Sequence, residues 1–196
     1  MQTDSNLLFT GGVTGSAQAI TSAAVRSTGI LDLATGLMNT GSTYAASPLT
    51  MGNATVFGED LGSGSKRFYG AAMIGTTFVG GTSLNIAWEG AVDASGGTYP
   101  ANLSGLTWTI YAETGAIPVA ALIAATAGFV GVQKGGMINL PDWPYRQIVA
   151  SMPRFISLLY TPVGTFSGGT ISLSGMFMPR PDFGLQYYPS GFSVGS

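Results

Sequence analysis

Short runs rich in valine, isoleucine, threonine and aromatic residues alternate with glycine-containing turns along most of the chain. The runs long enough to form strands are residues 18–22, 30–34, 66–78, 83–92, 106–112, 137–140, 155–160 and 171–176. Glycine pairs such as Gly80-Gly81 and Gly168-Gly169 punctuate the sequence around them. Regularly spaced short strands with glycine turns indicate a β-sandwich or a β-barrel.

Two parts of the chain show a clear period of two. In residues 83–92 the apolar positions 84, 86 and 88 alternate with Asn85, Ala87 and Glu89. Alternate residues of a strand point to opposite faces, so this run is predicted to be a half-buried strand. Residues 155–160 and 171–176 flank a turn at 165–169, and this pattern predicts a β-hairpin.

The rest of the pattern predicts one jelly-roll domain with an arm at each end. The helix candidate is a short alanine-rich stretch at 118–126, and no repeat or domain boundary is evident. Residues 1–16 lack periodicity, and residues 179–196 alternate prolines with aromatics. We therefore expect an all-β, jelly-roll-like antiparallel β-sandwich of about eight strands, with an N-terminal arm (1–16), a domain (17–178) and a C-terminal arm (179–196).

The C-terminal arm carries the aromatic residues Phe183, Tyr187, Tyr188 and Phe192. Burying one such side chain is worth about 1.5–3 kcal/mol, so the arm is expected to lie against a surface. That surface is either the chain's own domain or a neighbouring subunit, because aromatic residues are enriched at the centres of interfaces.

Charge is unusually sparse. Charged residues make up 8% of the chain and the net charge is −2, whereas about a quarter of an ordinary soluble domain is charged. Interface centres are depleted of charge, so this composition favours a protein that works inside an assembly over a free monomer with a Ser/Thr-rich surface. Without a cluster of basic residues beyond Lys66-Arg67, binding of nucleic acid is not expected.

The composition also removes most catalytic chemistry. The chain contains no cysteine and no histidine, which excludes a Ser-His-Asp triad, a Cys-His pair and a cysteine metal site. Glu89 and Asp93 lie about 13 Å apart along a strand, which is wide for a pair of catalytic carboxylates. The Ser65-Lys66 pair lies in a flexible glycine-rich turn. We expect a non-enzyme without cofactor or metal.

The sequence predicts neither a signal peptide nor a membrane-spanning segment. The first residues lack a basic segment before an apolar one, so no signal peptide is predicted. The charge-free stretch 117–132 is diluted by proline, threonine and glycine, and no membrane span is predicted. Among the tryptophans, Trp88 and Trp108 fall in strand patterns, whereas Trp143 lies between prolines and is the best candidate for an exposed aromatic.

The order of these elements resembles that of the jelly-roll capsid cement (decoration) proteins of tailed phages, of the type first recognised on a Bordetella phage. The segments that carry the resemblance are Asn6-Leu7-Leu8-Phe9 with 17–21, the element 27–33, the loop Glu59-Asp60-Leu61-Gly62-Ser63-Gly64, the strand 82–86, the turn 117–122 and the closing pair 153–160 and 166–171. The chain departs from that pattern in an insert at 37–57, a longer loop at 137–150 and the arm beyond Met178.

The resemblance implies a structural virion protein that is made in the host cytoplasm and binds the outside of the capsid. Its partners would be the major capsid protein and itself, as a homodimer or homotrimer. The interface candidates are Leu7, Leu8, Phe9, Trp143, Tyr145, Phe183, Tyr187, Tyr188 and Phe192. The alternatives are a carbohydrate- or receptor-binding jelly roll of a virion that uses Trp143, and a hydrolase that uses Glu89 or Asp93.

Overall fold

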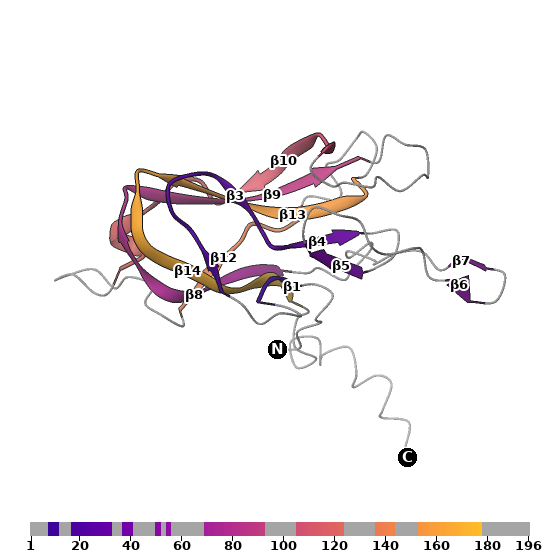
Figure 1. The fold of residues 1–196 in the computed structure, drawn as a ribbon, viewed down its shortest axis with the longest axis horizontal. Helices are drawn as coiled ribbons and strands as arrows, with labels where there is room; N and C mark the ends of the chain where they lie inside the picture. The colour runs from indigo at the N-terminus through magenta and orange to yellow at the C-terminus, as the bar shows by residue number, and fades with distance from the viewer. Residues whose placement is uncertain are drawn as a thin grey trace, which may run out of the picture.

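The computed structural model describes residues 8–11, 17–32, 37–40, 50–51, 54–55, 69–92, 105–123, 136–143 and 153–177. Within these residues the chain is all-β, apart from one short 3₁₀ turn, η3 (Val119–Ala121). Two antiparallel sheets pack face to face (Figure 1), which confirms the predicted antiparallel β-sandwich.

The first sheet has five strands and the second has seven. The five-stranded sheet runs in the order β1 (Leu8–Thr10), β14 (Phe166–Phe177), β8 (Tyr69–Gly80) and β12 (Met137–Asn139), and β2 (Gln18–Ala19) also pairs with β14. The seven-stranded sheet runs in the order β10 (Trp108–Glu113), β9 (Ser83–Ala91), β13 (Phe155–Val163), β4 (Gly29–Asp32) and β5 (Leu37–Thr40), with β11 (Ile117–Pro118) beside β9 and β3 (Val25–Arg26) beside β13. A separate two-stranded sheet joins β6 (Thr50–Met51) and β7 (Ala54–Thr55).

Each of the eight predicted runs overlaps an observed strand, but the N-terminal arm and the helix differ from the prediction. The predicted N-terminal arm includes β1, which pairs with β14 and therefore belongs to the sandwich; residues 1–7 and 12–16 lie outside the described residues. Where a helix is expected at 118–126, Pro118 is an extended strand residue at φ −64° and ψ 147° and η3 follows it; residues 124–126 lie outside the described residues. The C-terminal arm lies outside the described residues.

The predicted hairpin between residues 155–160 and 171–176 is wrong. The strands β13 and β14 follow one another directly, but β13 pairs with β9, β4 and β3, whereas β14 pairs with β8, β1 and β2. The turn at Gly164 and Thr165 therefore passes from one sheet to the other instead of reversing the chain within a sheet. The turn between β8 and β9 at Gly80 and Gly81 does the same.

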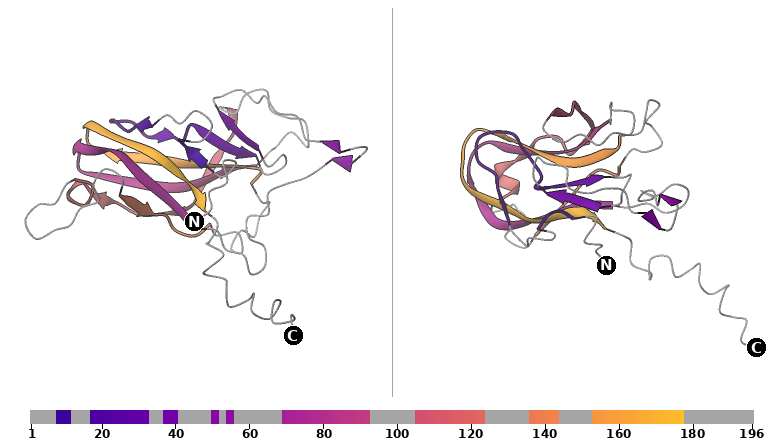
Figure 2. Two further views of the ribbon diagram at one scale, coloured as in Figure 1. Left: turned by 90° about the horizontal axis from the view of Figure 1, so that it is seen from below. Right: turned by 45° about the vertical axis from the view of Figure 1, so that its right-hand side comes forward.

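Three segments cross between the sheets side by side at one end of the sandwich, where Figures 1 and 2 show the strands bending from one layer to the other. They are residues 20–24, the turn before β9 and the turn before β14. Hydrogen bonds join them: the amide of Phe166 donates to the carbonyl of Thr21 at 3.0 Å, and the amide of Thr82 donates to the carbonyl of Val163 at 2.7 Å. A long antiparallel ribbon, β8–β9 with β13–β14, thus folds over this end, as strand pairs do in a jelly roll.

The turn at Gly164 is expected to require glycine. Its φ of 78° is left-handed, and an added Cβ would lie 3.2 Å from the Cα of Gly81. Because a left-handed residue with a Cβ costs about 1–2 kcal/mol, we expect Gly164→Ala to lower the unfolding free energy by that amount. Gly105→Ala is the matched control, since a Cβ there meets no atom within 4 Å. Equal melting temperatures for the two variants would contradict the expectation.

The core lies between the two sheets. It is built from large buried side chains of both layers, among them Phe9, Ile20, Ile74, Phe78, Trp88, Ile156, Leu158, Tyr160, Phe166 and Ile171. A second, smaller cluster of Ile30, Ala91 and Phe155 lies with Leu106 and Trp108. Because Ile30 and Phe155 neighbour the core residues Leu31 and Ile156 along their strands, this second cluster lies on the outer face of the seven-stranded sheet.

Strand β9 is buried on both faces, not on one as predicted. Ala87 and Glu89 face away from the core, yet they are 1% and 2% exposed. Arg26 and the second cluster cover this outer face. The sheet therefore has apolar packing on one side and a mixed ionic and aromatic layer on the other.

Candidate functional site

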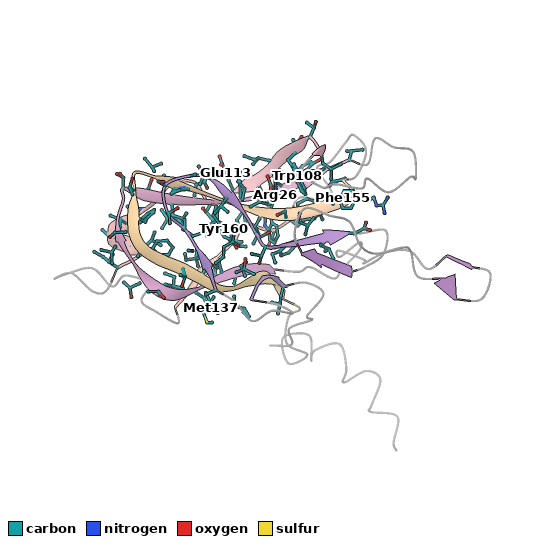
Figure 3. The ribbon with its side chains drawn as sticks, viewed as in Figure 1. Arg26, Trp108, Glu113, Met137, Phe155 and Tyr160 are labelled. Carbon is teal, nitrogen blue, oxygen red and sulfur yellow. The ribbon has the colours of Figure 1, made fainter. Side chains whose placement is uncertain are left out.

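The outer face of the seven-stranded sheet carries an ion pair stacked on an aromatic ring. Arg26 on β3 binds Glu89 on β9 through two nitrogens of its guanidinium group: Nε donates to Oε1, and Nη2 donates to Oε2 at 3.3 Å. The guanidinium carbon of Arg26 also lies 4.2 Å from the ring centre of Trp108 on β10. Figure 3 shows Arg26 and Trp108 close together on this layer. Such stacking adds a cation–π attraction to the ion pair.

A second ion pair lies towards the end of the same sheet. Nε and Nη2 of Arg154 donate to Oδ1 and Oδ2 of Asp32 at 2.9 and 3.2 Å. The Asp32 side chain is 0% exposed and that of Arg154 is 12% exposed. Arg154 also lies over the ring of Phe155. This bidentate arrangement fixes the end of β4 against the start of β13.

These pairs account for most of the charge in the described part of the chain. It contains six charged residues, which are Arg26, Asp32, Glu89, Glu113, Asp142 and Arg154. Both arginines bind a buried carboxylate, which leaves Glu113 and Asp142 outside ion pairs among the described residues. Glu89, the carboxylate of the hydrolase hypothesis, is buried and held by Arg26, and Asp93 lies outside the described residues. The described surface therefore presents almost no isolated charge.

A buried polar network joins the two sheets inside the core. The hydroxyl of Tyr160 on β13 lies 2.6 Å from the hydroxyl of Ser174 on β14 and 3.1 Å from that of Thr10 on β1. Thr10 also donates to Gln18, whose side-chain amide donates to the carbonyl of Arg26 at 2.6 Å. Figure 3 shows Tyr160 between the layers. The network holds β1 and the first crossing segment in register.

Because of Tyr160, the free energy of unfolding should fall at alkaline pH. Burial raises the pKa of Tyr160 to about 12, although its hydrogen bonds with Ser174 and Thr10 lower it. In the unfolded chain this tyrosine ionises near pH 10. Its contribution to the free energy of unfolding is therefore fully present below pH 10, and about 3 kcal/mol of it is lost as the pH rises towards 12. Tyr160→Phe should cost about 1–3 kcal/mol at pH 7 and should remove this dependence. Urea unfolding between pH 7 and 11 measures both effects; parallel pH profiles would contradict them.

Most predicted interface residues cannot be placed, and two of those that can are buried in the chain's own core. Leu7, Tyr145, Phe183, Tyr187, Tyr188 and Phe192 lie outside the described residues. Phe9 is 0% exposed, and its ring lies edge-to-face with that of Trp88, with 5.4 Å between the ring centres. Leu8 is partly buried and belongs to neither core cluster.

The expectation that Trp143 is exposed is wrong. Its side chain is 5% exposed and belongs to the main core cluster. The indole packs against Trp88 at 6.0 Å and against Tyr111 at 5.3 Å between ring centres. Its Nε1 is buried without a hydrogen-bond partner. Prolines beside a tryptophan in the sequence therefore do not imply that its side chain is exposed.

The apolar side chains that the structure does expose were not singled out from the sequence. The large exposed hydrophobic residues of the described part of the chain are Val79, Val92, Ile110, Met137 and Val163. Met137 points away from the core on the edge strand β12 (Figure 3), and Val79 and Val163 flank the crossing turns. A period of two separates the faces of a strand, but it does not say which strand ends remain uncovered.

The described residues contain no group of three or more acidic, histidine or cysteine side chains that could hold a metal ion. Among the same residues, no helix is long and apolar enough to cross a membrane. No protein-family model matches the chain, and no curated protein sequence is similar enough to count as a match.

Proposed function

We propose that the chain is a structural virion protein that binds the outer surface of a phage capsid and stabilises it by bridging neighbouring major capsid protein subunits. The observation that carries the proposal is the near absence of isolated charge on the described surface, where both arginines are bound to buried carboxylates. A surface of this kind suits contact with other proteins, because it leaves few charges to be stripped of water at an interface.

The rigid sandwich supports the same function. A cement protein must transmit load between shell subunits, and two sheets joined by hydrogen-bonded crossings, ion pairs and a buried polar network are hard to shear apart. Many identical copies around a capsid add weak individual contacts through multivalency. The order of the elements along the sequence, which resembles that of phage cement proteins, agrees with this role.

Binding to capsids tests the proposal directly. Purified protein is mixed with empty capsids of the major shell protein from the same virion and sedimented, and the melting temperature of the capsids is measured with and without it. We expect the protein to pellet with the capsids at a fixed ratio and to raise their melting temperature. Capsids of an unrelated phage are the control. A well-folded protein that stays in the supernatant with its own capsids would overturn the proposal.

The carbohydrate-binding alternative is not favoured by any observation in the described residues. It relied on an exposed Trp143, and that side chain is buried. A sugar stacks on the open face of an aromatic ring, whereas Trp143 packs against Trp88 and Tyr111 and is only 5% exposed.

A further inference from the structure

No further inference is drawn: the strongest candidate, the surface patch of Arg26, Trp108 and Ile110 on the outer face of the seven-stranded sheet, is partly open to solvent, but Arg26 already binds Glu89 and nothing in the described part of the structure shows what covers the patch.

Discussion

Replacing Asp32 with alanine is expected to lower the unfolding free energy by about 3–5 kcal/mol. The side chains of Asp32 and Arg154 are 0% and 12% exposed, so the substitution leaves the guanidinium of Arg154 buried without its carboxylate. The intact pair offsets the desolvation of the buried guanidinium with two hydrogen bonds, and the substitution removes both of them. Urea unfolding at neutral pH measures the loss.

Two further variants separate the ion pair from simple loss of packing. In the double variant Asp32→Ala/Arg154→Met neither charge of this pair remains, so the variant should be more stable than Asp32→Ala alone. Glu113→Ala removes an exposed carboxylate that accepts a hydrogen bond from Asn85, and it should cost less than about 1 kcal/mol. If Asp32→Ala costs as little as Glu113→Ala, the guanidinium of Arg154 has reached solvent and the assignment of a buried pair is wrong.

Replacing Trp143 with alanine is expected to cost about 3–5 kcal/mol of stability. The indole is 5% exposed and packs between Trp88 and Tyr111, so its removal opens a cavity in the main core. Trp143→Phe keeps an aromatic ring and removes the Nε1 group that has no hydrogen-bond partner. It should therefore cost less than about 1.5 kcal/mol. Chemical unfolding of the three proteins gives the comparison.

The same variants distinguish a core role for Trp143 from a role in binding. A core role predicts that Trp143→Phe pellets with capsids as wild type does, and that Trp143→Ala loses stability. An interface role predicts the opposite: Trp143→Ala with an unchanged unfolding free energy but reduced capsid binding. That second result would restore the original expectation of an exposed tryptophan.

The strands were predictable from the sequence, whereas their pairing was not. Alternation of apolar and polar residues is a local property, and it predicts strands that overlap β9, β13 and β14, although it places residues 166–169 of β14 in a turn. Whether a glycine turn reverses the chain within a sheet or carries it to the opposite sheet depends on distant partners. For β13 and β14 those partners are β9 and β8, which occur earlier in the sequence, so the local pattern alone predicts a hairpin with its turn at 165–169.

Burial of the outer face of the seven-stranded sheet escaped prediction for the same reason. Glu89 looks like a solvent-facing residue in its strand, and only the approach of Arg26 and Trp108 shows that it is covered. The low overall charge favours a protein that works inside an assembly, but it gives no position for a contact surface.

The ribbon that folds over the end of the sandwich also sets how the chain reaches its native state. The pairing of β9 with β13 joins residues from 64 positions apart, Ala91 with Phe155, to 80 positions apart, Ser83 with Val163. Contacts between such distant parts of a chain form slowly, because a large loop must close before they contribute. We therefore expect single-domain folding on a timescale of about milliseconds to seconds, set by the meeting of these two strands. Until they meet, each leaves an apolar strand edge without its central partner, and newly made chains are at their greatest risk of aggregation.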